Sequence, residues 1–388
     1  MQEPLPIHNN TGDAEFMAQA LARARSVIGR TSPRPPVGAV VVRDGAVVGV
    51  GATDPPYGPH AEVNALRQAG ELSGGADLYV TLEPCCVTIH TPPCTRAILE
   101  AGIRRVVVAT LDPNPLVAGR GVAQLREAGV EITVGPGSAE AQEIIRPFST
   151  FITRHRPHFS AKWAMTLDGK IATYTGDAYW ISNEASRVWV HNFREEVDAI
   201  IIGSATARLD DPQLTVRLEP HQHWYPRTNR PGGPLRVVVS THGDLPAHLK
   251  LLQPALANGT CIIVGEGAPP ENIDRLRASG AEVMRAEVNQ EGLIDMQTLS
   301  SLLEEKGLMH VLIEGGSQLL GRAFDQRLID QVAAFIAPRL IGGHGAPSPI
   351  GGMGLSTMKH ALTLANQRSQ IIDGDILIQG LIVYKECV

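Results

Sequence analysis

The stretch of sequence that decides the fold of the first half runs from residue 58 to residue 102, GPHAEVNALRQAGELSGGADLYVTLEPCCVTIHTPPCTRAILEAG. The histidine of its HAE triplet opens a run with apolar residues at helical spacing, which predicts a helix over 60–69. The apolar run at 78–82 predicts a strand, and the pattern after two prolines predicts a second helix over 95–101. A helix, a strand and a helix in this order indicate an α/β architecture.

Elements of the same kind flank this stretch. Asp13 is a good N-cap for a helix whose apolar face runs from Phe16 to Val27. Asp44-Gly45 is a hairpin signal between two short apolar runs. The remaining predicted elements are strands at 37–42, 46–50, 105–110 and 130–134 and a helix at 122–128. This alternation predicts a three-layer α/β sandwich.

A second α/β pattern follows a segment that we interpret as a boundary. Residues 143–158 contain Pro147 and Pro157, which favour a boundary over a core element, so we expect domains at 1–150 and 151–388. The predicted strands are 159–164, 199–203, 235–239, 260–264, 282–284, 310–314 and 331–336. The predicted helices are 182–196, 271–278 and 298–306, and the proline-rich segment 219–234 is predicted to be an irregular loop.

Four residues of the opening stretch predict a catalytic zinc site. His60, Cys85 and Cys94 supply one imidazole and two thiolates, which leaves the fourth position of a tetrahedral zinc open. Glu62 is two residues from a ligand and is suited to move protons during replacement of an amine by water. Two cysteines nine apart also occur as small buried apolar residues. Their combination with HAE at a helix start is far rarer and favours zinc.

Bulk properties narrow the class of protein. The chain has 388 residues, a net charge of −6 and no long run of Lys or Arg, which argues against nucleic acid as a partner. No apolar run approaches the roughly 20 residues that span a bilayer, and MQEPLPIHNN has no signal-peptide features. Five cysteines make a poor disulfide framework in so long a chain. We therefore expect a soluble, cytoplasmic protein with no membrane partner.

Several motifs taken together resemble one enzyme family. In the first half these are TSPRPPVGAVVVRDG, GPHAEVNALRQAG, YVTLEPC, TPPCTRAILEAG and DPNPLVAGRGVAQLREAG. In the second half they are AMTLDGK, YWIS, GSAT, LDDPQLTVR and IEGGS. Their order resembles the bifunctional riboflavin-biosynthesis deaminase/reductase family. The resemblance implies an N-terminal cytidine-deaminase-like three-layer α/β/α domain, then a dihydrofolate-reductase-like α/β domain that uses NADPH. It also implies a homo-oligomer.

The resemblance also implies residue roles. His60, Cys85 and Cys94 would hold Zn²⁺, and Glu62 would be the proton donor. The implied NADPH-binding residues are Ala164, Trp180, Thr206, Asp210 and Gly316. The implied substrate-binding residues are Arg194, Leu214, Arg217 and Glu314. The substrate would be a phosphorylated pyrimidine, deaminated first and then reduced from a ribosyl to a ribityl side chain. The glycine pair after 314 is not the G-x-G-x-x-G fingerprint, so the pattern alone does not predict NADPH.

The sequence departs from the family mainly in the deaminase half. Arg34 replaces an Asn, Thr53 lies near the place of a His, and Cys86 to His90 replace the usual residues between the two zinc cysteines. Unlike an amide, Arg34 can only donate hydrogen bonds. We interpret Cys86 as a spare small side chain rather than a ligand. Three hypotheses stay open: a divergent riboflavin enzyme, a paralogue that deaminates another amino-heterocycle, and a non-catalytic zinc module beside an active reductase. Glu62 argues against the last, and the altered loop argues for it.

Overall fold

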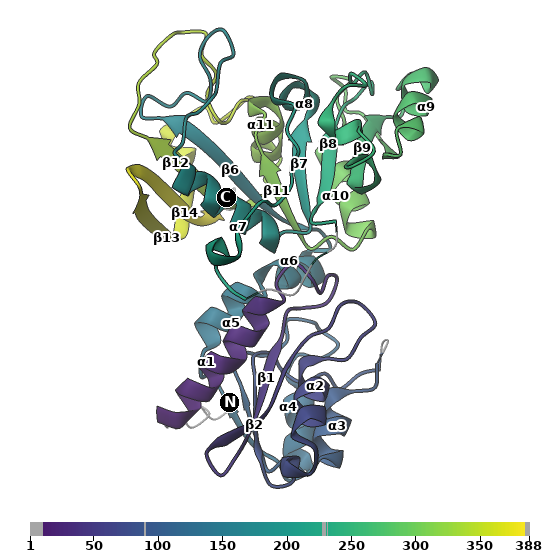
Figure 1. Ribbon diagram of the computed structural model, residues 1–388, viewed down its shortest axis with the longest axis vertical. Helices are drawn as coiled ribbons and strands as arrows, with labels where there is room; N and C mark the ends of the chain where they lie inside the picture. The colour runs from purple at the N-terminus through teal and green to yellow at the C-terminus, as the bar shows by residue number, and fades with distance from the viewer. Residues whose placement is uncertain (1–10, 89–90, 227–229, 231, 385–388) are drawn as a thin grey trace. The chain divides into compact units, whose positions relative to one another are not determined.

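The computed structural model describes residues 11–88, 91–226, 230 and 232–384 (Figure 1). Of the residues discussed above, Ile89 and His90 lie outside the described part. The chain divides into two compact units, each described separately below. One comprises Met1–His155 with His223–Arg230, and the other comprises Arg156–Gln222 with Pro231–Val388.

The first unit is built on a five-stranded sheet of order β2-β1-β3-β4-β5. The strands are β1 (Gly38–Arg43), β2 (Ala46–Ala52), β3 (Asp77–Val80), β4 (Arg105–Val108) and β5 (Glu131–Val134). β1 pairs antiparallel with β2 and β3, while β3, β4 and β5 run parallel. The helices are α1 (Thr11–Ser26), α2 (Ala61–Ala69), α3 (Cys94–Glu100), α4 (Arg120–Glu127), α5 (Ser138–Ile144) and α6 (Arg146–Arg154). The predicted hairpin is confirmed.

Helices cover both faces of this sheet. A Cβ on Gly38 of β1 would lie 1.9 Å from the carbonyl oxygen of Ala20 in α1. A Cβ on Gly51 of β2 would lie 2.1 Å from the carbonyl oxygen of Ala61 in α2. α1 and α2 lie on opposite sides of the sheet (Figure 1). Backbone therefore approaches backbone on each face, which only glycine permits. The predicted three-layer sandwich is confirmed.

The second unit is built on a nine-stranded sheet of order β10-β9-β8-β7-β11-β6-β12-β14-β13. The first seven strands in this order are parallel, and β14 and β13 add antiparallel at one edge. The strands are β6 (His158–Thr166), β7 (Ala199–Gly203), β8 (Leu235–Val239), β9 (Thr260–Gly265), β10 (Glu282–Ala286), β11 (His310–Glu314), β12 (Ile329–Ala337), β13 (Thr363–Ile372) and β14 (Asp375–Val383).

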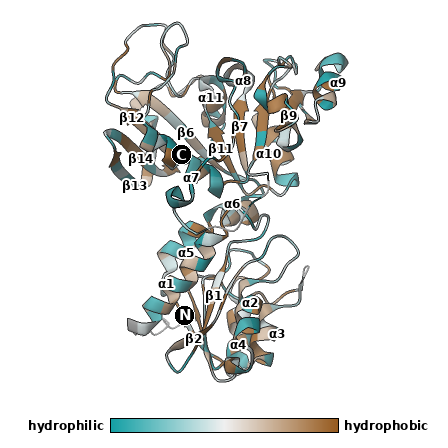
Figure 2. Cartoon of the chain, viewed as in Figure 1, coloured by the Kyte–Doolittle hydropathy of each residue, from teal (hydrophilic) through white to brown (hydrophobic). Residues whose placement is uncertain are grey.

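The central strands of this sheet are apolar because both of their faces are covered. In β7, Ile200 and Ile202 pack with α7 (Glu184–Glu196) and α9 (Pro270–Ala278). Ile201, between them, packs with α10 (Met296–Glu305) and α11 (Ser317–Asp325) on the other face. Figure 2 shows the result as hydrophobic strands β7 and β9 between helices. In the described part of the chain, no helix combines the length and the apolar character that crossing a bilayer requires.

The boundary segment differs from the prediction. Residues 146–154 form α6 and bury Phe148, so this segment contributes a core side chain. Pro147 does not prevent the helix because it lies in the first turn, where the missing N–H has no intrahelical partner. Four further features of the described residues lie outside the predicted set: α5, α8 (Ser204–Asp210), α11 and the hairpin formed by β13 and β14.

Candidate active sites

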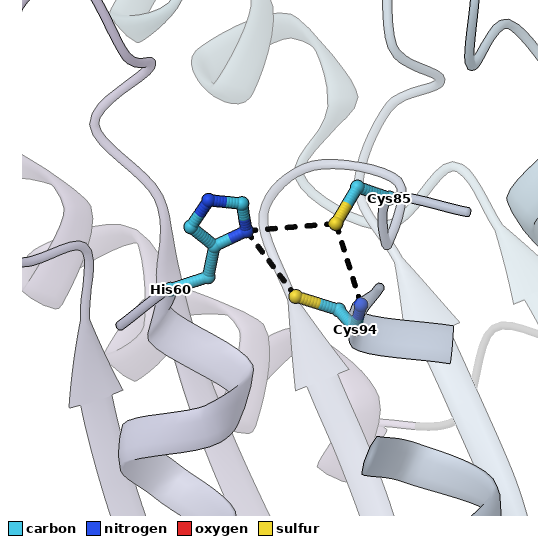
Figure 3. A group of neighbouring side chains, drawn as sticks. All are labelled: His60, Cys85 and Cys94. Atoms are coloured by element: carbon cyan, nitrogen blue, oxygen red, sulfur yellow. Dashed lines mark hydrogen bonds between the residues drawn. The ribbon is translucent and has the colours of Figure 1, made fainter. Parts of the chain in front are cut away.

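The structure brings His60, Cys85 and Cys94 together in the first unit (Figure 3). His60 is the N-cap of α2, Cys85 follows β3, and Cys94 begins α3. The imidazole Nδ1 of His60 lies 3.3 Å from the Sγ of Cys94 and 3.6 Å from the Sγ of Cys85. All three ligand atoms lie within 4.8 Å of one another. The nitrogen that faces the thiols is therefore Nδ1.

These distances fit zinc. With Zn–S near 2.3 Å and Zn–N near 2.0 Å, two ligand atoms of a tetrahedral site lie about 3.6 Å apart. The two nitrogen–sulfur separations match that value closely. Among the described residues, this is the one group of three or more His, Cys, Asp or Glu side chains whose ligand atoms converge in this way. Cys86, which is half-buried, does not belong to it, and burial raises the pKa of its thiol.

The two thiols of the cluster share their protons unequally. The hydrogen bond with Cys94 lowers the pKa of Cys85 to about 4, with a further contribution from His60. The same bond, together with burial, raises the pKa of Cys94 well above its usual value. The amide of Cys94 donates to the Sγ of Cys85 over 3.3 Å and stabilises the thiolate. A divalent cation would replace the shared proton, since metal binding requires deprotonated thiols.

Glu62 lies on the first turn of α2, next to the cluster. Only 3% of its surface is exposed, and this burial raises the pKa of its carboxyl to about 7. A carboxyl with a pKa near the working pH can both donate and accept a proton. Proton transfer is also the role that the sequence predicts for Glu62.

A second glutamate holds the loop beside Cys85. The carboxylate of Glu83 accepts hydrogen bonds from the amides of Asp112, Gly119 and Val122, at 2.8–3.1 Å. A Cβ on Gly121 would lie 2.0 Å from the carbonyl oxygen of Pro84. The start of α4 is thus packed tightly against the turn that carries Cys85.

The second unit contains a cleft of about 1560 Å³. It lies at the carboxyl ends of the parallel strands β6, β7, β8 and β11, where open α/β sheets bind ligands. The residues predicted for NADPH and substrate all line it: Ala164, Trp180, Arg194, Thr206, Asp210, Leu214, Arg217, Glu314 and Gly316. One cavity therefore gathers residues that the sequence places far apart.

A buried ion pair lies in the wall of this cleft. Nε and Nη2 of Arg194 donate to the two carboxylate oxygens of Glu314, at 2.6 and 2.7 Å. The side chains are 12% and 8% exposed. Burial alone would raise the pKa of Glu314, but the guanidinium of Arg194 lowers it. Arg217 is held less firmly, since its Nη1 donates to Thr215 Oγ1 over 2.7 Å and to Gln213 Oε1 over 3.3 Å.

The residues predicted for NADPH lie on the loops and helices around the strand ends. Thr206 and Asp210 are on α8, and Trp180 is on the segment between β6 and α7. A Cβ on Gly316, which has φ of +84°, would lie 3.1 Å from Oγ1 of Thr206. The guanidinium of Arg187 stacks on the ring of Trp180, and its Cζ lies 4.6 Å from the ring centroid. This part of the cleft wall therefore contains the tight turn at Gly316, the hydroxyl of Thr206 and the exposed indole of Trp180.

Lys162 also lines the cleft and belongs to none of the motifs predicted to bind NADPH or substrate. It is an ammonium in the middle of β6, and burial lowers its pKa while Glu314 counteracts that shift. The sequence feature that marks Lys162 is a charged residue inside the largely apolar strand FSAKWAM. Buried lysines are rare unless they are paired or functional.

Two family models match the chain. The model described as "Cytidine and deoxycytidylate deaminase zinc-binding region" matches residues 10–110. The model described as "RibD C-terminal domain" matches residues 157–378. The two matches cover the zinc cluster and the cleft respectively.

Characterised relatives match nearly the whole chain. The riboflavin biosynthesis protein RibD of Aquifex aeolicus is 39% identical over 366 residues, which cover 94% of this chain and 97% of the relative. The RibD protein of Bacillus amyloliquefaciens is 40% identical over 366 residues, covering 94% and 95%. A structure of Acinetobacter baumannii RibD aligns with a TM-score of 0.81 at 32% identity, over 96% of this chain and 99% of that one.

A structure from Thermotoga maritima, described as a diaminohydroxyphosphoribosylaminopyrimidine deaminase and 5-amino-6-(5-phosphoribosylamino)uracil reductase, aligns with a TM-score of 0.80 at 32% identity. It covers 97% of this chain and 100% of that one. The predicted fold, family and pair of activities are confirmed by these matches. The chain belongs to the RibD family of riboflavin-biosynthesis enzymes, with a zinc-binding deaminase domain followed by a reductase domain of the NADPH-using type.

Proposed function

We propose that both halves turn over, and that the chain deaminates a phosphoribosylaminopyrimidine and then reduces its ribosyl group to a ribityl chain. The observation that carries this proposal is the zinc geometry around His60 Nδ1 with the buried carboxyl of Glu62 beside it. A zinc module that only stabilises the fold does not require a proton carrier. The hypothesis of a non-catalytic N-terminal half is therefore disfavoured.

In the deaminase half, His60, Cys85 and Cys94 would hold the metal and leave one position open. Bound there, zinc supplies Lewis-acid activation of water near neutral pH. Glu62 would take the proton of that water on its carboxylate and deliver protons to the ring nitrogen and to the leaving amine. Burial favours the protonated form of this carboxyl, whereas the positive charge of zinc would favour the carboxylate, so both forms are accessible.

In the reductase half, Ala164, Trp180, Thr206, Asp210 and Gly316 would position NADPH, with Gly316 allowing close approach of backbone to a phosphate. Arg217 and the Arg194–Glu314 pair, with the backbone of Leu214, would hold the sugar phosphate. Arg217 suits the phosphate because a planar guanidinium can bind phosphate oxygens in pairs, whereas the donors of Arg194 are already engaged by Glu314 and Thr215. The protein's contribution to hydride transfer is mainly orientation.

We also propose self-association and a cytoplasmic location. The strand β13 forms one edge of the nine-stranded sheet in the described residues, and Ile371 on it is 77% exposed. An exposed edge strand presents unpaired N–H and C=O groups that can pair with a strand of another chain. The thiol ligands Cys85 and Cys94 must remain reduced, which the cytoplasm favours. Sedimentation velocity of the purified full chain tests self-association, and a monomer at all concentrations would contradict it.

A two-stage assay tests the proposed function. The purified full chain is given the diamino-ribosylaminopyrimidine phosphate, first without and then with NADPH, while ammonia and NADPH absorbance are followed. We expect ammonia release without NADPH, and NADPH oxidation only after ammonia has been released. Absence of ammonia from a zinc-loaded enzyme that still oxidises NADPH with deaminated substrate would restrict the chain to reduction. Ammonia release from a different amino-heterocycle alone would identify a paralogue.

A further inference from the structure

We propose that Arg34 is a positioning residue of the deaminase, which braces the segment 54–59 and thereby holds His60 against Cys85 and Cys94. The inference rests on the zinc role proposed for those three residues. It concerns the position at which this chain departs from the Asn of its family. The guanidinium of Arg34 donates to three backbone carbonyls, and an amide side chain could not satisfy all of them.

The guanidinium of Arg34 lies among converging backbone carbonyls. Its Nη1 donates to the carbonyl oxygen of Gly58 over 2.7 Å. Its Nη2 donates to the carbonyl oxygen of Asp54 over 2.5 Å and to that of Pro55. The carboxylate of Asp54 also attracts the guanidinium and partly offsets the effect of burial on the pKa of Arg34. The hydrogen bonds of the side chain go to backbone carbonyls.

The backbone of Arg34 is itself fixed. Its amide donates to the carbonyl oxygen of Thr31 over 2.9 Å. The hydroxyl of Thr31 donates back to the carbonyl oxygen of Arg34 over 2.8 Å. Thr31 is only 1% exposed. Two reciprocal hydrogen bonds therefore fix the turn from Thr31 to Arg34 and restrict the position from which the guanidinium extends.

The braced segment leads directly into the zinc ligand. Asp54 and Pro59 close it with an amide-to-carbonyl hydrogen bond of 3.1 Å. His60 follows at once, and its carbonyl oxygen accepts the amide of Asn64 in the first turn of α2 over 3.1 Å. The backbone of His60 is therefore held by α2 on one side and by the segment 54–59 on the other. Arg34 supplies the cross-links of the second side.

The same geometry argues against Arg34 as a substrate ligand. Both terminal nitrogens are directed at the carbonyls, and its Nε is buried without a partner. Thr53, a second departure from the family, also bonds to backbone, since its hydroxyl accepts the amide of Val37 over 3.1 Å. The polar groups of both side chains are thus engaged with backbone, and only those of Arg34 reach the segment that leads to His60.

Arginine is the side chain that this set of carbonyls favours. It carries five N–H donors in a planar fork, whereas a glutamine has two donors and a lysine has a single nitrogen. The carbonyls that accept from Arg34 are half-buried at Asp54 and Gly58 and exposed at Pro55, and each would lose a charged hydrogen bond, which is stronger than a neutral one. Replacement of Arg34 should therefore loosen the segment and the imidazole that follows it.

The test compares three variants of the full-length protein. Arg34→Gln removes the charge and most donors, and Arg34→Lys keeps only the charge. Arg43→Gln is the matched control, because Arg43 also donates to one carbonyl, that of Gly74 over 2.7 Å, but its side chain is 41% exposed. Three quantities are measured: zinc release to a colorimetric chelator, the visible spectrum of the Co²⁺-substituted protein, and kcat and KM of deamination.

We expect Arg34→Gln to release zinc at least about tenfold faster, from the loss of charged hydrogen bonds. The cobalt spectrum should change, and kcat should fall while KM stays within about twofold, because the residue does not touch substrate. Arg34→Lys should fall between, and Arg43→Gln should match the wild type. Circular dichroism and thermal unfolding of the full chain show whether each variant is folded, because the reductase unit could stay active beside an unfolded deaminase unit. If Arg34→Gln is not folded, the same criteria apply to Arg34→Lys.

Unchanged zinc release and an unchanged cobalt spectrum in a folded Arg34 variant would overturn the inference. A rise in KM alone would also overturn it, and would make Arg34 a substrate ligand instead. Failure of the proposed zinc site is a separate outcome, since it would show as wild-type protein that holds no zinc at all.

Discussion

The zinc cluster and the reductase cleft represent two different ways of building a site. The cluster takes its three ligands from 60–94 and holds their atoms within 4.8 Å of one another. The cleft has a volume of about 1560 Å³ and is lined by residues from Lys162 to Pro349. Metal chemistry requires a few residue types at short range, whereas a nucleotide and a sugar phosphate require a long surface. The first site is therefore compact in sequence, and the second exists only after folding.

Cys85→Ser should have the largest effect on this comparison. Loss of an outer partner of a metal ligand already costs about 10–100-fold in affinity, so loss of a ligand thiolate should cost more. We expect most of the zinc and all measurable deamination to disappear, while reduction of deaminated substrate continues. Elemental analysis and the two separate assays check this. Cys86→Ser is the control, and equal zinc loss in both variants would contradict the ligand assignment.

Arg194→Ala should produce the largest effect within the cleft. It leaves the carboxylate of Glu314 buried without its partner, which typically costs roughly 3–5 kcal/mol. We expect a lower melting temperature for the reductase unit and a loss of substrate binding. Arg194→Lys, which keeps the charge without the fork, should recover part of both. Unaltered thermal unfolding of the alanine variant would show that the pair is not structurally required.

Arg217→Ala should have a smaller and more selective effect. Arg217 is held by hydroxyl and amide groups rather than by a carboxylate, so its removal leaves no buried charge. Loss of one charged hydrogen bond to the substrate phosphate should weaken the free energy of substrate binding by about 1.5–3 kcal/mol. KM should therefore rise roughly tenfold or more. NADPH binding, followed by nucleotide fluorescence, should hardly change. Arg208→Ala, which removes an arginine paired with Asp244, is the control. If Arg217→Ala weakened NADPH binding and Arg208→Ala did not, Arg217 would be a cofactor-binding residue instead.

The smallest expected effect is a pH dependence confined to the reductase unit. Burial, and secondly the neighbouring His158, lower the pKa of His310 well below its usual value. An unfolded histidine binds a proton near pH 6.5, so below that pH the unfolded chain gains a proton that the folded one excludes. Stability should therefore fall as the pH decreases from about 7 to about 5, by up to about 1.4 kcal/mol per pH unit.

Thermal unfolding of the full chain at these pH values measures this dependence. His310→Gln should reduce the dependence, because that side chain no longer titrates, and the part that remains is the contribution of His191, whose pKa is also lowered. Acid lability that is equal in the variant and in the wild type would remove His310 as its origin and would leave His191, whose pKa burial lowers to about 4, as its cause.

The sequence predicts strands better than it predicts the helices that line the cleft. β7, β8 and β11 match their predicted bounds because both of their faces are buried and their apolar runs are continuous. α11 was not predicted because Gly321 interrupts its pattern. In the structure that glycine is needed, since a Cβ would lie 2.2 Å from the backbone of Gly351. A contact with a residue thirty positions away cannot be read from local periodicity.

The two sites differ in the same way. The residues His60, Glu62, Cys85 and Cys94 carry their chemistry in their identity, and spacing alone predicts their role. Lys162 and Arg34 have ordinary side chains whose roles depend on which carbonyls or carboxylates face them after folding. For the cleft, the resemblance to a family named the residues, and the structure brought them into one cavity.

The most direct test of two independent sites in one chain is Glu62→Gln assayed with both substrates. General acid–base transfer contributes about 10²–10⁴ in rate, so deamination should fall by that factor while zinc stays bound. Reduction of deaminated substrate should keep the wild-type kcat and KM, because Glu62 belongs to the first unit and the cleft to the second. A variant that deaminates within a few-fold of the wild type would remove Glu62 from the mechanism. A folded variant that loses both activities together would contradict the independence of the two sites.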